Sequence, residues 1–242
     1  MRSLIFGGTS GLGFSLAEAS IEKGIEPIIV GRQPRPDAYP IDARTEFVDV
    51  ADDAAVAALM DRFTVQPSLG FGYLFYTPGV FLTGDLREQT DAQVRKVMNV
   101  NYFGLVNVLR HFHRMKKKPY HLIAISSTAA WRDVAGEAAY GASKAAMDRY
   151  VRDSHYQRVR DLPGSRTLLV HPGGMKSRFW EGSAFDTSKF MDTDLIASHI
   201  WDEVHAQELG DQPDLHEVHY IRQPDGTPRT VRGPNLPELP RS

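Results

Sequence analysis

The chain has 242 residues with 28 basic and 30 acidic side chains, so its formal net charge of −2 gives no global electrostatic case for binding nucleic acid. It contains no cysteine, which excludes disulfides and thiolate metal sites and fits a cytoplasmic protein. We expect neither a signal peptide nor a membrane span, because a basic start with a long apolar core is missing and no apolar run approaches the ~20 residues that cross a bilayer.

Short apolar segments alternate with helical patterns along the chain. The sequence predicts strands at residues 4–6, 27–30, 46–48, 72–76, 121–125, 167–170 and 218–221, and helices at 13–23, 52–63, 91–115, 138–159 and 194–209. This alternation is typical of an α/β fold in which a doubly wound parallel sheet of about seven strands carries helices on both faces. We expect one domain over residues 1–242, ending in an edge strand and then a loose tail at about 223–242, where Pro, Gly and charged residues accumulate.

A glycine-rich loop, Gly7-Gly8-Thr9-Ser10-Gly11-Leu12-Gly13, stands between the first predicted strand and the first predicted helix. Glycines at this point permit a tight turn and let backbone amides approach a pyrophosphate at a helix N-terminus. A simple turn is the alternative interpretation of such a loop taken alone.

Tyr140 and Lys144 lie four residues apart in the predicted helix 138–159, so they share one face of that helix. A lysine ammonium near a tyrosine stabilises the phenolate and lowers the tyrosine pKa from ~10 towards neutrality, which makes the phenol a usable acid. Ser127 follows the predicted strand 121–125, at the edge where open α/β sheets hold their ligands. Taken alone, the Tyr–Lys pair has an alternative interpretation, in which both side chains lie on a solvated helix face and have no catalytic role.

The histidines predict no metal site. His111 and His113 are two apart on a predicted helix and therefore face different ways, while His216 and His219 bracket a short strand. Neither pair has a third ligand at a suitable spacing in the sequence.

These residues together resemble the short-chain dehydrogenase/reductase family, in its short single-domain branch, over about residues 1–222. The matching features, in chain order, are the Gly-x-x-x-Gly-x-Gly loop with Gly7, Gly11 and Gly13, the adenine-side pair Asp49-Val50, the catalytic tetrad Asn101, Ser127, Tyr140 and Lys144, the turn Pro172-Gly173, and Ser177 in place of the usual threonine. The resemblance implies a single-domain Rossmann fold and hydride transfer between a nicotinamide cofactor and a carbonyl or alcohol substrate.

The resemblance also implies a role for each member of the tetrad. Tyr140 is expected to give a proton to the carbonyl oxygen during reduction, and Ser127 to hydrogen-bond the same oxygen. Lys144 is expected to lower the pKa of Tyr140 and to bind the nicotinamide ribose, while Asn101 holds a water that links Lys144 to solvent. The expected cofactor-binding residues are Gly7, Thr9, Ser10, Gly11, Leu12, Gly13, Arg32, Asp49, Val50, Thr77, Gly79, Tyr140, Lys144, Pro172, Gly173 and Ser177.

The end of the second predicted strand bears on the choice of cofactor. An acidic residue ~20 positions after the glycine loop holds the ribose 2′-hydroxyl of NAD, but Gly31 stands at that position here. Arg32 follows it, and a guanidinium suits the 2′-phosphate of NADP, although a surface arginine at a loop start is the alternative. We therefore expect NADP(H) in preference to NAD(H).

The sequence departs from the family pattern in two places near the glycine loop. Phe6 stands where threonine is usual, and Tyr76-Thr77-Pro78-Gly79 replaces the stretch Asn-Asn-Ala-Gly. The lost asparagines help to hold the central sheet and the cofactor, so their loss affects the local cofactor geometry rather than the fold. We expect the Thr77 hydroxyl to replace one of the two amides.

Other functions on this scaffold remain open from the sequence. One is an NADP-binding redox sensor or regulatory protein without turnover, and another is pteridine reduction or dehydration. Phe81, Trp131, Phe179 and Trp180 are expected near the pocket mouth, where they favour an apolar or aromatic carbonyl compound or else pack as a lid. The expected partners are a small-molecule substrate and a second copy of the chain, as a homodimer or homotetramer through the helices 91–115 and 138–159, with neither nucleic acid nor a membrane.

Overall fold

The structure, a computed structural model, describes residues 1–33, 41, 43–182 and 185–234. Its centre is one sheet with the strand order β3-β2-β1-β4-β5-β6-β7-β8. The strands are β1 (Arg2–Phe6), β2 (Glu26–Gly31), β3 (Arg44–Phe47), β4 (Phe71–Tyr76), β5 (His121–Ile125), β6 (Arg166–Pro172), β7 (Leu215–Arg222) and β8 (Pro228–Arg232). All neighbouring strands pair in parallel except β7 and β8, which are antiparallel. The predicted α/β fold with a mostly parallel sheet is thus confirmed.

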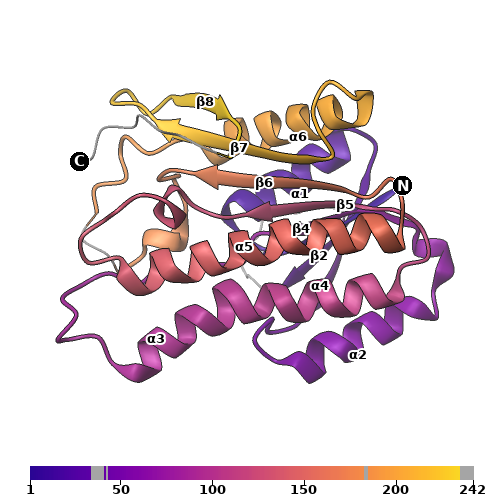
Figure 1. Ribbon diagram of the computed structural model, residues 1–242, viewed down its shortest axis with the longest axis horizontal. Coiled ribbons are helices and arrows are strands. Elements are labelled where there is room, and N and C mark those ends of the chain that lie inside the picture. The colour runs from indigo at the N-terminus through magenta and orange to yellow at the C-terminus, as the bar shows by residue number, and fades with distance from the viewer. Residues whose placement is uncertain (34–40, 42, 183–184, 235–242) are drawn as a thin grey trace.

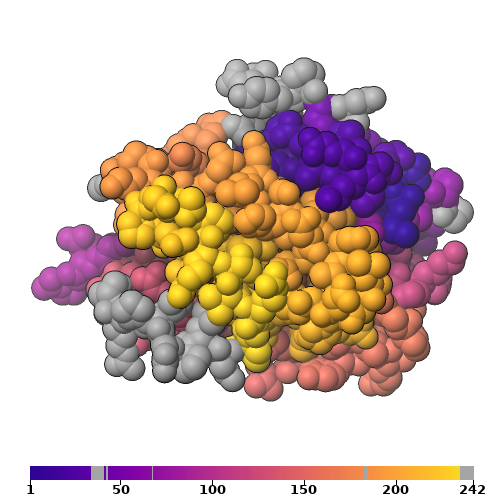
Figure 2. All heavy atoms as spheres, turned by 90° about the horizontal axis from the view of Figure 1, so that it is seen from above, coloured from indigo at the N-terminus to yellow at the C-terminus, as the bar shows by residue number. Residues whose placement is uncertain are grey.

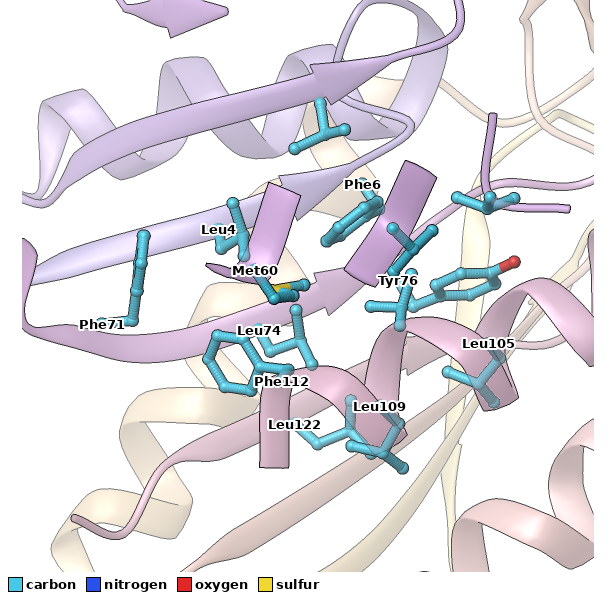
Figure 3. Packing of buried hydrophobic residues seen from close by; sticks show 14 of the residues in the cluster. Leu4, Phe6, Met60, Phe71, Leu74, Tyr76, Leu105, Leu109, Phe112 and Leu122 are labelled. Atoms are coloured by element: carbon cyan, nitrogen blue, oxygen red, sulfur yellow. The ribbon is translucent and has the colours of Figure 1, made fainter. Parts of the chain in front are cut away.

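Helices cover both faces of the sheet (Figure 1). On one face lie α2 (Asp53–Thr64), α3 (Asp91–Met98), α4 (Gly104–Met115) and α5 (Ala138–Asp161), and on the other lie α1 (Gly11–Glu22) and α6 (Thr193–Leu209). Side chains alternate along each strand, so Leu4 and Phe6 belong to the apolar cluster under α2 and α4, whereas Ile5 belongs to the cluster under α1 and α6. Figure 3 shows the first cluster, in which Leu74 and Phe112 join Leu4 in the interior.

The segment predicted as one helix over 91–115 contains a π-helical turn, η2 (Asn99–Phe103), between α3 and α4. The hydroxyl of Tyr76, at the end of β4, donates a 2.5 Å hydrogen bond to the carbonyl of Val100 in this turn. A Cβ on Gly104 would stand 2.5 Å from that hydroxyl, so only glycine fits there. The turn leaves Asn101 fully buried, which is typical of a π-bulge that places a functional side chain.

Part of the segment predicted as a loose tail instead forms β8. Gln223 and Thr227 close a hairpin with a backbone hydrogen bond of 2.9 Å, and Gly226 takes a positive φ of 85° in the turn. Arg232 then pairs with Glu203 of α6 at 2.6 Å. Pro, Asp and Gly are turn residues as well as markers of disorder, and here they make a turn. Figure 2 shows this C-terminal hairpin, in yellow, beside α6, in orange; residues 235–242 lie outside the described part of the chain.

Across the described ranges, no helix has both the length and the apolar character that crossing a bilayer requires.

Candidate active site

A cavity of about 1360 Å³ opens at the carboxyl ends of the strands from β1 to β6. Most of the residues predicted to bind a cofactor line it: Gly7, Thr9, Ser10, Gly11, Leu12, Gly13, Arg32, Asp49, Val50, Thr77, Gly79, Tyr140, Pro172, Gly173 and Ser177. Ser127 lines it as well, whereas Lys144 and Asn101 lie behind its wall. Residues that are far apart in the sequence therefore meet at one edge of the sheet, as in other open α/β sheets that bind ligands there.

The glycine loop forms a cradle at the N-terminus of α1. Gly7 and Gly11 take positive φ values of 80° and 51°, which glycine adopts without strain. A Cβ on Gly13 would lie 2.4 Å from the carbonyl oxygen of Gly7, so the two turns of the loop approach more closely than any side chain permits. Backbone amides exposed in this way at a helix start fit the pyrophosphate of a dinucleotide.

Thr77 joins the glycine loop to the centre of the sheet. Its hydroxyl donates a 2.7 Å hydrogen bond to the carbonyl of Phe6, and its backbone amide donates to the same oxygen at 3.0 Å. The hydroxyl oxygen also lies 2.3 Å from the position of a Cβ on Gly7 and 2.6 Å from that on Gly13. The Thr77 hydroxyl thus links β4 to β1, and the Tyr76 hydroxyl links β4 to η2.

Gly31 and Thr9 explain why the second strand ends without an acid. A Cβ on Gly31 would stand 2.3 Å from Cγ2 of Thr9 and 2.6 Å from its hydroxyl oxygen. The side chain of Thr9 therefore fills the space that a residue at position 31 would need. Arg32, the next residue, is exposed and lines the cavity.

Tyr140 and Ser127 come together at the cavity wall. The Tyr140 side chain is buried, and the Ser127 side chain hydrogen-bonds with it. Burial raises the pKa of Tyr140 above its ordinary value, and the hydrogen bond with Ser127 only partly opposes this shift. The predicted lowering of this pKa by Lys144 is therefore wrong for the protein alone, in which desolvation dominates.

Lys144 and Asn101 meet behind Gly79. A Cβ on Gly79 would lie 3.8 Å from Nζ of Lys144 and 3.9 Å from Oδ1 of Asn101. Lys144 donates a 2.9 Å hydrogen bond to the carbonyl of Ile125, and burial lowers its pKa to about 8. The Asn101 amide binds both the N–H and the carbonyl of Val80, at 2.8 and 3.0 Å. Asn101 thereby fixes the loop after β4.

Aromatic rings close the cavity above Tyr140. The ring of Phe81 lies 5.1 Å from that of Tyr140, 4.9 Å from that of Trp180 and 5.7 Å from that of Phe179. These rings line the cavity, as predicted for three of the four aromatic residues. Trp131 does not line it and instead packs edge-on against His219 of β7 at 5.5 Å.

A group of buried polar residues beneath the site was missed from the sequence. Asp148 continues the helical stripe of Tyr140 and Lys144 by one more turn, so the spacing of four was the signal that pointed to it. His171 and His219 are paired in the register of β6 and β7, and their rings stack at 4.3 Å.

His171, Glu217 and His219 also bring three potential metal ligands within 4.8 Å of one another, a grouping that the sequence did not reveal. Arg152 already binds both carboxylate oxygens of Glu217, at 2.7 and 2.8 Å. The two imidazole rings lie nearly parallel, at 13°, whereas the nitrogens of two ligands must converge on an ion. The grouping therefore fits an ion-pair and hydrogen-bond network better than a metal centre.

Comparisons with known proteins agree with this geometry. The model of a family described as short chain dehydrogenase matches residues 2–184. An uncharacterized oxidoreductase from Myxococcus xanthus (strain DK1622) is 27% identical over 202 residues, which cover 79% of this chain and 78% of that protein.

Two solved structures have the same fold. A short-chain dehydrogenase from Streptomyces avermitilis is similar with a TM-score of 0.75 and 21% identity, over 89% of this chain and 88% of that one. A short-chain dehydrogenase/reductase from Vibrio parahaemolyticus is similar with a TM-score of 0.70 and 26% identity, over 83% of this chain and 91% of that one.

Proposed function

This chain belongs to the short-chain dehydrogenase/reductase family and is an oxidoreductase that uses a nicotinamide cofactor, and we propose that it reduces a carbonyl compound, or oxidises the matching alcohol, with Tyr140 as the proton donor. One observation carries the proposal: Tyr140 and Ser127 are hydrogen-bonded to each other in the wall of the cavity that the glycine loop also lines. A carbonyl oxygen placed between the two hydroxyls receives a hydrogen bond from each.

In this mechanism the cofactor, when bound, supplies or accepts the hydride. Tyr140 gives its proton to the substrate oxygen as negative charge develops there, and Ser127 orients that oxygen. Lys144 lies one helical turn from Tyr140 with its ammonium buried behind Gly79, and in this mechanism its positive charge favours the phenolate form of Tyr140. Asn101 holds the loop after β4 in place through its two hydrogen bonds with Val80. This loop separates Lys144 from the cavity.

We propose NADP(H) rather than NAD(H) as the cofactor. Thr9 fills the space above Gly31, so this position offers no carboxylate to a ribose hydroxyl. Arg32 lines the cavity next to it and offers a guanidinium to a 2′-phosphate.

A panel of carbonyl compounds tests the proposal, with loss of the reduced cofactor followed by absorbance in parallel with NADPH and NADH. The rings around Phe81 favour apolar and aromatic ketones and aldehydes, so the panel should be rich in these. We expect turnover with NADPH that disappears in Tyr140→Phe. Turnover that persists in this variant contradicts the assignment of the proton donor.

The same rings favour a second candidate function. Phe81 and Phe179 both pack against Tyr140, at 5.1 and 6.0 Å, so aromatic rings cover part of the Tyr140 ring. A protein that binds NADP as a redox sensor without turnover does not need an open phenol. Tight binding of NADPH with no turnover over a broad panel favours this candidate. Self-association through the segment 91–115, which comprises α3, η2 and α4, and through α5, as a dimer or tetramer, belongs to both candidates and is tested by light scattering.

A further inference from the structure

His171 is a fully buried histidine directly beneath the loop that carries Ser127. It lies on β6, one residue before the end of the strand, and its Nδ1 is 3.4 Å from the backbone carbonyl oxygen of Ser127. The ring does not line the cavity. It reaches the candidate active site only through the backbone of Ser127.

Polar side chains from α5 and β7 gather around this ring. From α5, Asp148 places Oδ2 at 3.6 Å from Nδ1. From β7, Glu217 places Oε2 at 3.4 Å from Nε2, while the ring of His219 stacks on the face at 4.3 Å. Arg152 of α5 neutralises Glu217 through two hydrogen bonds.

The oxygen atoms around His171 determine which form of the ring fits. The backbone carbonyl oxygen of Ser127 near Nδ1 can only accept a hydrogen bond, so Nδ1 carries the proton in this contact. The oxygen of Glu217 lies 3.4 Å from Nε2, on the other side of the ring. The N–H at Nδ1 points at the Ser127 backbone.

Asp148 connects this ring to the lysine of the site. It lies one helical turn beyond Lys144 on the same face of α5, and both side chains are buried. Lys144, Asp148 and Arg152 follow one another along this face, so basic and acidic side chains alternate there. His171 lies between the carboxyl groups of Asp148 and Glu217. A displacement of His171 therefore disturbs both the Ser127 backbone and the environment of Lys144.

We propose that His171 is a positioning residue of the active site, which holds the Ser127 loop in place through Nδ1 and joins it to the Asp148 side of α5. This inference rests on the proposed function for its catalytic consequence, but its geometric part stands on the packing of β6, β7 and α5 alone. The Ser127 hydroxyl must stay within hydrogen-bond reach of a substrate oxygen, and a misplacement of about 1 Å costs up to about a hundredfold in rate.

Two conservative variants separate this role from mere packing. The amide nitrogen of asparagine takes nearly the place of Nδ1, whereas that of glutamine takes nearly the place of Nε2. His171→Asn therefore keeps a donor for the Ser127 carbonyl, and His171→Gln loses it but keeps a partner for Glu217. His155→Gln is a matched control, because His155 is a buried histidine of α5 whose Nδ1 contacts Thr167 at 2.8 Å, away from the cavity.

The first measurement needs no substrate. Hydrogen exchange of the Ala129 amide, which donates to the Ser127 hydroxyl oxygen at 3.2 Å, reports on the loop directly. We expect exchange to become up to about tenfold faster in His171→Gln, the upper range for loss of one neutral hydrogen bond, and to stay near the wild-type rate in His171→Asn and His155→Gln. Equal acceleration in the two His171 variants overturns the proposal.

The second measurement uses a substrate found in the carbonyl panel. His171→Gln should lower kcat about ten- to a hundredfold with the KM for NADPH nearly unchanged, and His171→Asn should restore most of kcat. A parallel fall of kcat in both variants, matched by equal losses of stability, shows a structural role and overturns the proposal. If the wild type turns over no substrate, the proposed function fails, while the exchange measurement still decides the geometric part.

Discussion

Replacing Tyr76 by phenylalanine removes one oxygen atom from the junction between β4 and the π-helical turn. The Tyr76 side chain is fully buried, and its hydroxyl donates to the Val100 carbonyl at 2.5 Å and lies 2.5 Å from where a Cβ on Gly104 would stand. Loss of one hydrogen bond with its acceptor left partly buried costs about 1–2 kcal/mol, which lowers the melting temperature of a chain of this size by about 2–8 °C.

The same change has a local consequence for the site. Val100 precedes Asn101, whose side chain binds both polar backbone groups of Val80, so a looser turn releases the loop after β4. We expect Tyr76→Phe to speed hydrogen exchange at the Val80 amide about tenfold, the value of one hydrogen bond of about 1.4 kcal/mol, and to lower kcat as well.

Tyr73→Phe provides the matched control. Tyr73 lies on the same strand but on the opposite face, and its hydroxyl donates to Glu208 of α6 at 2.6 Å. Urea denaturation followed by circular dichroism should show a loss of stability with an unchanged m-value in both variants. Only Tyr76→Phe should affect Val80 exchange and kcat. An unchanged Val80 exchange rate in a destabilised Tyr76→Phe protein would refute the link between the π-helical turn and the site.

Three further predictions concern the cofactor and the buried lysine. Tyr140→Phe should fold and bind NADPH, measured by titration, but lose about 10²–10⁴-fold in turnover, the usual contribution of a positioned general acid. Arg32→Ala should weaken NADPH binding about ten- to a hundredfold and leave NADH binding nearly unchanged; equal affinity of the wild type for the two cofactors contradicts this. Burial lowers the pKa of Lys144 to about 8 from 10.5, so at pH 7 the folded protein carries a buried ammonium at a cost on the order of 3 kcal/mol, and this cost disappears as the pH rises from about 8 to 10.5. Lys144→Met should therefore be more stable than the wild type at pH 7 in urea denaturation, with a difference that narrows above pH 8, while its turnover is lost; lower stability of the variant at pH 7 contradicts the assigned burial cost.

The sequence predicted the sheet because its central strands are short, uninterrupted apolar runs. Leu122, Ile123 and Ala124, for example, form a continuous apolar run that is buried on both faces of β5. Such a run indicates a central strand of a parallel sheet without any alternation of apolar and polar residues. The hairpin at β8 was not predicted, because Pro, Asp and Gly signal both turns and disorder and only the partner strand β7 decides between them. The π-helical turn was also hidden, since Asn99 to Phe103 follow ordinary helix periodicity and the Tyr76 contact comes from a distant strand.

Within the site, the motifs identified the residues that touch the cavity and also Lys144 and Asn101 behind its wall, but not the buried polar residues beneath Ser127. Asp148 was within reach, because it repeats the spacing between Tyr140 and Lys144. His171 and Glu217 were not, since their proximity depends on how β6 and β7 pair and on how α5 packs over both. The direction of the pKa shift of Tyr140 was also beyond the sequence, because it depends on how fully the surrounding rings exclude water from the phenol.

The contact between Thr9 and Gly31 limits how this protein can acquire a different cofactor. An acidic side chain at position 31 overlaps Cγ2 of Thr9 until that residue becomes smaller, and a smaller residue at position 9 alone leaves a hole beside Gly31. Each single change is therefore harmful in the absence of the other. A change to an acidic residue at position 31 therefore requires a second substitution at position 9, so packing opposes a switch from the proposed NADP(H) preference to NAD(H).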